Sequence, residues 1–262
     1  MDTDLGAQDA ITLLPVVERA TDRIAHVVAD QQLQPGQPSL LPGWTIANVL
    51  SHLWYGAVAS LRMTEHVLEG HGEVDFYPGG PAEREESIRS GDTLLPDALV
   101  QRLREASNEL AATWGQLHAR DWNRTFVEPR LGPIALTRLV ALRLTELEVH
   151  HTDMGTGYDP EDWEPTFVDR CLPLRVAWLP HHRTRSDANL SINGRWCLHV
   201  HHGPSWIVAA NGQHAQVEPG EDETARKLAG SGEQVLAMLL GRTAHVEPAE
   251  ELARFKQAFP GP

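Results

Sequence analysis

Cysteine is almost missing from the 262-residue chain, which contains only Cys171 and Cys197. The two residues are not spaced as a CxxC pair, so they suggest no disulfide framework. Cys197 lies in an alternating stretch typical of a strand, where we expect it to be a small buried hydrophobic residue. Any thiol chemistry of this protein is therefore expected to use a thiol supplied by another molecule.

Positive charge is also scarce, because 22 Lys and Arg stand against 36 Asp and Glu, for a formal net charge of −14. This imbalance argues against nucleic acids and anionic membranes as partners. No apolar run approaches the roughly 18 residues of a membrane span. The acidic start lacks the basic and apolar regions of a signal peptide, so we expect a cytoplasmic protein.

Nucleotide-binding and serine-hydrolase motifs are missing as well. The chain has no P-loop, no G-x-G-x-x-G and no G-x-S-x-G sequence. These absences argue against sites built on those motifs, so candidate residues must come from other combinations.

Helical periodicity dominates the first part of the chain. Apolar residues recur at helical spacing over residues 8–30, 46–70, 95–119 and 133–154. Four long amphipathic helices in this length are typical of a four-helix bundle. The connection over residues 71–92 is long enough to be functional or mobile.

From about residue 163 the pattern changes to shorter segments, which predict a smaller α+β domain. We expect helices and two hairpins at residues 165–178, 188–192 with 195–201, 205–210 with 213–217, 221–240 and 248–258. The sequence thus predicts two domains, of residues 1–160 and 161–262.

Glu146 and His150 are the first candidate site residues, because residues four apart share one face of a helix. Spacing alone favours a surface pair. His52, on the second predicted helix, has small residues one turn away and is either a core histidine or a third ligand. Three protein ligands with an open fourth position are typical of catalytic zinc. Asp153 could orient such a ligand or be a surface residue at the helix end.

A second group of histidines offers a rival metal site in the later domain: His181, His182, His199, His201, His202 and His214. His199 and His201 share one strand face, although a solvated sheet face is the commoner meaning of that pattern. Arg242, taken alone, indicates an arginine that satisfies carbonyls at a helix end.

Several short motifs, spread along nearly the whole chain, indicate a family resemblance. They are Leu41-Pro42-Gly43-Trp44-Thr45 followed by His52, Phe76-Tyr77-Pro78 with Arg84-Glu85, Ile88 and Gly91, Glu146-x-x-x-His150-x-x-Asp153, and Ser231-Gly232 to Gly241-Arg242. In their order and spacing these motifs resemble the mycothiol-dependent maleylpyruvate isomerase family.

The resemblance implies an N-terminal DinB-like four-helix metal-binding domain, followed by an α+β domain related to sterol-carrier-type folds that contributes Arg242 to the cleft. It also implies zinc, or another divalent metal, held by His52, Glu146 and His150. Mycothiol would be the thiol cofactor, and Arg242 would be catalytic.

The reaction implied by the family converts maleylpyruvate to fumarylpyruvate by thiolate addition, bond rotation and elimination. One alternative is a mycothiol S-transferase that adds the thiol to an electrophile in detoxification or natural-product biosynthesis. Another is a non-catalytic protein whose second domain holds a small apolar ligand. We expect a monomer whose partners are a small-molecule thiol and a small electrophile.

Overall fold

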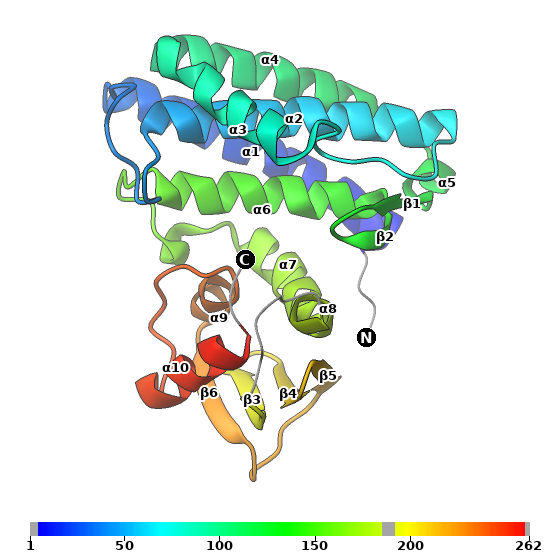
Figure 1. The fold of residues 1–262 in the computed structure, drawn as a ribbon, viewed down its shortest axis with the longest axis vertical. Helices are drawn as coiled ribbons and strands as arrows, with labels where there is room; N and C mark the ends of the chain where they lie inside the picture. The colour runs from blue at the N-terminus through cyan, green and yellow to red at the C-terminus, as the bar shows by residue number, and fades with distance from the viewer. Residues whose placement is uncertain (1–4, 185–191, 260–262) are drawn as a thin grey trace. The chain divides into compact units, whose positions relative to one another are not determined.

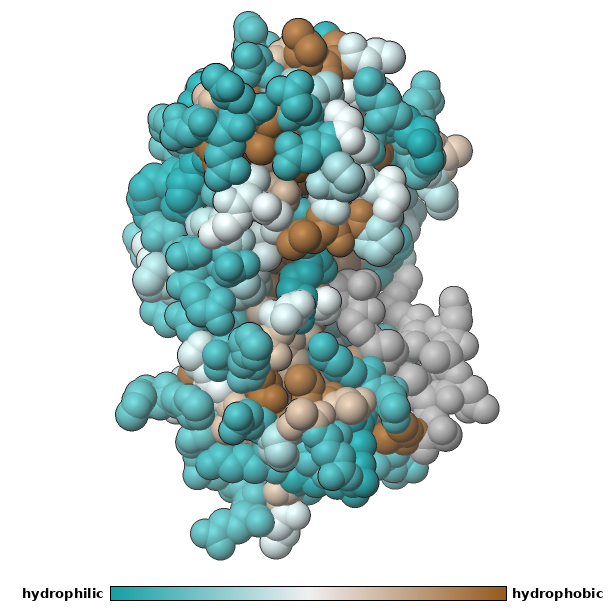
Figure 2. All heavy atoms as spheres, turned by 90° about the vertical axis from the view of Figure 1, so that its left-hand side faces the viewer, coloured by the Kyte–Doolittle hydropathy of each residue, from teal (hydrophilic) through white to brown (hydrophobic). Residues whose placement is uncertain are grey.

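The structure is a computed structural model that describes residues 5–184 and 192–259. The chain divides into two compact units, Asp4–Asp159 and Pro160–Pro262, which we call the helical unit and the sheet unit. Within the described residues, no helix combines the length and the apolar character needed to cross a bilayer. On the face drawn in Figure 2, hydrophilic side chains cover most of the surface.

The helical unit is a four-helix bundle, as the sequence predicts (Figure 1). Its long helices are α1 (Ala7–Asp30), α2 (Ile46–Glu69), α4 (Pro96–Gly115) and α6 (Thr137–Asp153), and a short α5 (Ala119–Trp122) follows α4. Both α1 and α2 pack against α4 and α6. The consecutive helices α1 and α2 therefore lie at opposite corners of the bundle.

The start of α2 follows from two side chains. The hydroxyl of Thr45 accepts a hydrogen bond from the backbone N–H of Asn48 at 3.3 Å, and Oδ1 of Asn48 accepts one from the N–H of Thr45 at 3.0 Å. This capping box satisfies two donors that the first helical turn leaves unpaired. At the other end Gly70 has a φ of 95°, a left-handed conformation that glycine adopts without steric cost.

The connection over residues 71–92 contains a helix that the sequence did not reveal. This helix, α3 (Gly80–Arg89), is followed by a 3-10 turn at Ser90–Thr93. Only Ser87 and Ile88 of α3 are buried. With so few apolar positions, its sequence carries no helical hydrophobic period for a pattern search to detect.

The predicted start of the fourth helix near Pro133 is wrong. Residues Gly132–Ala135 form strand β2, which pairs antiparallel with β1 (Thr125–Glu128), and α6 begins only after this hairpin. Phe126 and Ile134 face each other across it and are both buried. Their cross-strand contact stabilises the hairpin where Pro133 had indicated a first helical turn.

Hydrogen bonds hold α3 and the turn after it against the first half of α2. The amide of Asn48 donates to the carbonyl oxygen of Ile88 at 3.3 Å and to Oδ1 of Asp92 at 2.6 Å. The hydroxyl of Ser51 donates to the carbonyl oxygen of Ser87 at 2.7 Å. Because Ser51 precedes His52, these bonds position α3 beside a candidate site residue.

Gly91 allows this close approach, and we expect Gly91→Ala to destabilise the protein. An added Cβ would lie 2.7 Å from the carbonyl oxygen of Ala47 and 2.8 Å from Cβ of Ser51. Overpacking of this kind typically costs about 1–3 kcal/mol of unfolding free energy. Urea denaturation measures it, with Gly115→Ala as the control because a Cβ there meets nothing within 4 Å. Equal stabilities of the two variants would contradict the packing argument.

Within the described residues, the sheet unit contains four strands in the order β5-β4-β3-β6. They are β3 (Gly194–Val200), β4 (Ser205–Asn211), β5 (His214–Pro219) and β6 (Arg226–Gly230). The predicted second hairpin is confirmed, because β4 and β5 pair antiparallel. The strand predicted at residues 188–192 lies, apart from Ile192, outside the described residues.

Helices complete the sheet unit. They are α7 (Pro165–Ala177), α8 (Leu179–Thr184), α9 (Gly232–Leu239) and α10 (Ala249–Ala258), with a 3-10 turn at Pro160–Asp162.

The helix predicted over residues 221–240 is wrong in its first half. There, β6 pairs parallel with β3 and places buried Leu228 opposite buried Leu198. A parallel partner about thirty residues away gives no local signal, so the sequence alone did not show this strand. The mixed architecture, a helical bundle with a smaller α+β part, agrees with the predicted fold class.

Candidate metal centre

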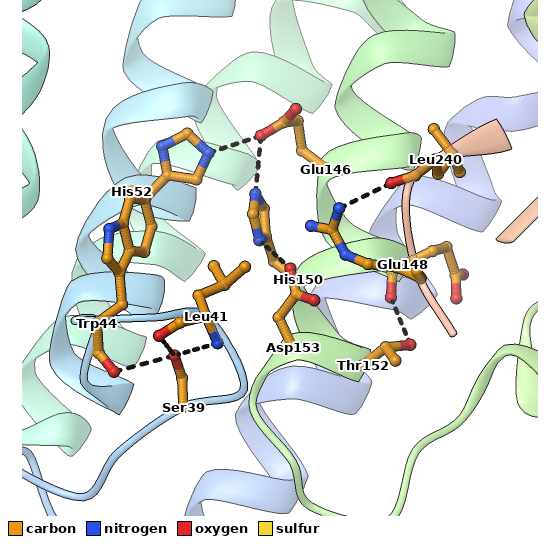
Figure 3. A network of polar contacts seen from close by, with 11 residues as sticks. Ser39, Leu41, Trp44, His52, Glu146, Glu148, His150, Thr152, Asp153 and Leu240 are labelled. Carbon is orange, nitrogen blue, oxygen red and sulfur yellow. Dashed lines mark hydrogen bonds and ion pairs between the residues drawn. The ribbon is translucent and has the colours of Figure 1, made fainter. Parts of the chain in front are cut away.

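Three side chains predicted from the sequence converge inside the helical unit (Figure 3). His52 comes from α2, and Glu146 and His150 come from successive turns of α6. Oε2 of Glu146 lies 2.6 Å from Nε2 of His52 and 3.3 Å from Nε2 of His150. One ligand atom from each residue lies within 4.8 Å of the other two. The two helices thus bring two imidazole nitrogens and a carboxylate oxygen to one point.

The two histidines are buried, whereas the Glu146 side chain is 44% exposed. The interpretation of Glu146 and His150 as a simple surface pair therefore does not hold. A site with buried nitrogen donors and a partly exposed carboxylate gives a small molecule a side from which to approach.

Asp153 orients His150. Its Oδ2 lies 2.8 Å from Nδ1 of His150, and the Asp153 side chain is buried. The alternative of a surface residue at the helix end is thus wrong. A carboxylate bound to Nδ1 leaves Nε2 of the same ring for a metal and makes that nitrogen a better donor. His52 differs, because its buried Nδ1 has no hydrogen-bond partner among the described residues.

The protonation of the three candidate ligands is strongly coupled. The partial burial of Glu146 would raise its pKa, but hydrogen bonds to His150 and His52 hold this pKa well below its usual range. Burial of His150 has the opposite effect and would lower its pKa. Hydrogen bonds to Asp153 and Glu146 nevertheless raise the pKa of His150 to about 9. For His52 burial prevails and lowers the pKa, although Glu146 opposes it. A bound metal would replace the protons on both Nε2 atoms.

Trp44 packs against both histidines. Its ring stacks on His150 with centroids 6.3 Å apart and meets the edge of His52 at 5.6 Å. The hydroxyl of Ser39 donates to the carbonyl oxygen of Trp44 at 3.0 Å, and the N–H of Leu40 donates to the carbonyl oxygen of Asp153 at 2.8 Å. The loop before α2 is therefore hydrogen-bonded to the end of α6, and the indole of Trp44 in this loop packs against His52 and His150.

Arg143 was not identified from the sequence. It lies one turn before Glu146, is buried, and donates from its guanidinium to the carbonyl oxygen of Leu53 at 2.8 Å. Burial lowers the pKa of Arg143 to about 10. A Cβ on Gly56 would lie 3.2 Å from this guanidinium. The small residue one turn after His52 thus makes room for an arginine, which the spacing alone did not reveal.

Among the described residues, the rival histidines of the sheet unit form no group of three donors close enough together for a metal. Nδ1 of His199 lies 2.8 Å from Oε1 of Glu221 and 2.9 Å from the hydroxyl of Ser205. Within the described ranges, His52, Glu146 and His150 are the group of three whose ligand atoms gather closely enough for a metal. His199 and His201 therefore fit the solvated sheet face that we considered the commoner meaning.

Arg242 lies in the sheet unit, just after α9. It donates to the carbonyl oxygen of Leu240 at 2.8 Å, and Gly241 between them has a φ of 73°. This contact matches the expectation of an arginine that satisfies carbonyls at a helix end. A catalytic role for Arg242 stays a prediction.

The residues that are present fit a divalent transition metal. Two imidazole nitrogens and one carboxylate oxygen suit zinc and leave a fourth position for water, thiol or substrate. The contact between His150 and Asp153 is the carboxylate–histidine arrangement common at such centres.

We expect Asp153→Asn to lower the affinity for zinc about 10- to 100-fold, the usual effect of losing a group that orients a ligand. The amide keeps the shape of Asp153 but not its charge, so Nε2 of His150 becomes a weaker donor. Competition with a zinc-binding dye measures the affinity, and Asp97→Asn, an exposed change on α4, is the control. Unchanged affinity in Asp153→Asn would contradict the orienting role.

A family model matches the part of the chain that carries the candidate metal centre. The model of the mycothiol maleylpyruvate isomerase N-terminal domain matches residues 17–155, which include all three candidate ligands. No curated protein matches the chain.

Solved structures show the same fold. A crystal structure of the mycothiol-dependent maleylpyruvate isomerase is 19% identical, covers 92% of this chain and 91% of its own, and has a TM-score of 0.69. A His-to-Ala variant of that enzyme gives 18% identity, the same coverage and a TM-score of 0.68. YfiT from Bacillus subtilis, described as a probable metal-dependent hydrolase with an unusual four-helix bundle topology, is 18% identical, with coverage of 59% and 89% and a TM-score of 0.50.

Proposed function

Because the chain belongs to the mycothiol maleylpyruvate isomerase N-terminal domain family, we propose that it is a zinc-dependent enzyme that uses mycothiol to isomerise maleylpyruvate to fumarylpyruvate. The observation that carries the proposal is the convergence of His52, Glu146 and His150 from two helices. The match to the family model spans all three residues. It supports the proposal that these donors serve the isomerase reaction for which the family is named.

His52, Glu146 and His150 would hold the metal through Nε2, a carboxylate oxygen and Nε2. A divalent cation in that position would keep a thiol in its thiolate form at neutral pH, where thiolate is the reactive species. Asp153 holds the His150 ring so that its Nε2 faces Glu146. Trp44 packs against both imidazoles.

Arg242 is our proposed catalytic residue. Its guanidinium would stabilise negative charge that develops on a carbonyl-derived oxygen of the substrate, or clamp a carboxylate through two parallel hydrogen bonds. Arginine suits both tasks because it stays charged and presents a planar fork of donors.

The test is an assay of purified zinc-loaded protein with mycothiol and maleylpyruvate. Isomerisation changes only the geometry of a double bond, so the absorbance of the cis substrate should fall while the thiol concentration stays constant. Consumption of one thiol per substrate would instead identify an S-transferase. Absence of turnover with every electrophile tried would overturn the enzymatic proposal and favour a ligand-binding protein.

A further inference from the structure

Arg84 is a cation close to the metal centre that no part of the proposed mechanism uses. It lies on α3, and its Cζ is 5.7 Å from the ring centroid of Trp44. The same ring contacts His52 and His150, so Arg84 and both imidazoles pack on one indole. The charge of Arg84 also contributes to the electrostatic environment of His52, where burial is the largest influence on the pKa.

The guanidinium of Arg84 has no hydrogen bond or ion pair within residues 5–184 and 192–259. The acids next to it on α3 are engaged elsewhere. Oε2 of Glu83 accepts from the backbone N–H of Gly79 at 2.6 Å, and Glu85 pairs with Arg89 at 2.6 Å. An arginine stacked on an indole keeps the N–H groups at its edge available for another partner.

Hydrogen bonds from α2 fix the position of α3, the helix that carries Arg84. Asn48 and Ser51 both lie on α2 in the turn before His52. They hold α3 by donating hydrogen bonds to the carbonyl oxygens of Ile88 and Ser87, respectively. Bonds of this kind link the helix that carries Arg84 to the helix that carries His52. The side chain therefore projects from a fixed element, which is what a binding group for a substrate needs.

We propose that Arg84, stacked on Trp44, binds a carboxylate of the electrophilic substrate beside the metal centre. This proposal rests on the proposed function and deepens it, because it assigns the site to electrophiles that carry a carboxylate. Arginine pairs with carboxylates through two parallel N–H···O bonds, which orient the ligand as well as attract it. A net charge of −14 makes such a local cation important for drawing in an anion.

The test compares Arg84→Gln and Arg84→Lys with the wild type and with Arg89→Gln, an exposed arginine on the same helix. In Arg84→Gln we expect the KM for maleylpyruvate to rise about 10- to 100-fold, the loss typical of a hydrogen bond to a charged group. Zinc content and the KM for mycothiol should not change. Arg84→Lys should recover part of the loss, and Arg89→Gln should match the wild type.

Calorimetric titration with maleate, a small cis-dicarboxylate, tests the same contact without turnover. Its affinity should fall in Arg84→Gln by the same factor as KM rises. Zinc-loaded, active protein in which Arg84→Gln leaves both quantities unchanged would overturn this assignment and leave the proposed function standing. A rise confined to the KM for mycothiol would place the contact on the thiol and also overturn it. Wild-type protein without zinc or turnover would instead refute the proposed function, while the maleate titration still decides on Arg84.

Discussion

His52→Ala is expected to abolish stoichiometric zinc binding and to lower kcat/KM by more than about 100-fold. His52 supplies one of three protein ligands from α2, and the remaining pair lies on α6 alone. Loss of a direct ligand should exceed the roughly 10- to 100-fold effect of losing a group that only orients one. Without the metal, a thiol would keep its ordinary pKa and be mostly protonated at neutral pH.

Glu146→Gln and His150→Ala should behave in the same way, because each removes one of the other two donors. Metal content is measured by elemental analysis of dialysed protein, and activity by the loss of cis-substrate absorbance. His199→Ala is the matched control, since His199 also pairs with a carboxylate, Glu221, but belongs to no group of three donors in the described part of the chain. A His52→Ala variant that retains one zinc per chain and wild-type activity would refute the assignment.

Chelation provides a second approach to the same prediction. Dialysis of the wild type against a chelator should remove activity, and added zinc should restore it. Zinc binding to the folded state should also raise Tm, since a ligand at 100 times its Kd stabilises by about 2.7 kcal/mol. In His52→Ala this zinc-dependent rise in Tm should disappear.

Arg242→Gln is expected to lower kcat about 100- to 1,000-fold, the range seen when one donor to a developing oxyanion is removed. The metal content should stay at the wild-type level, because Arg242 is not one of the three donors. The side chain also donates to the carbonyl oxygen of Leu240, so a purely structural role is a real alternative.

Two measurements separate catalysis from structure at Arg242. A catalytic role predicts a loss of kcat with an unchanged Tm, and partial recovery in Arg242→Lys, which keeps the charge without the planar fork. A structural role predicts a lower Tm with kcat retained in the folded fraction. The second pattern would refute our proposal for Arg242.

Local patterns predicted most of the fold. The four long helices follow from a hydrophobic period of 3.6, and the hairpin of β4 and β5 follows from alternation around Asn211-Gly212. The errors fall where a partner far along the chain decides the structure. Strand β6 is specified by its parallel neighbour β3, and α3 by hydrogen bonds to α2.

The candidate site divides in the same way. Spacing alone placed Glu146 and His150 on one face of α6, because residues four apart always align on a helix. Only the tertiary structure brought His52, 94 residues before Glu146, to within 2.6 Å of its carboxylate. It also buried Asp153 against His150 and set Arg84 over Trp44. These contacts depend on how the bundle packs α2 and α3 around α6, and neither helical periodicity nor sequence spacing contains that information.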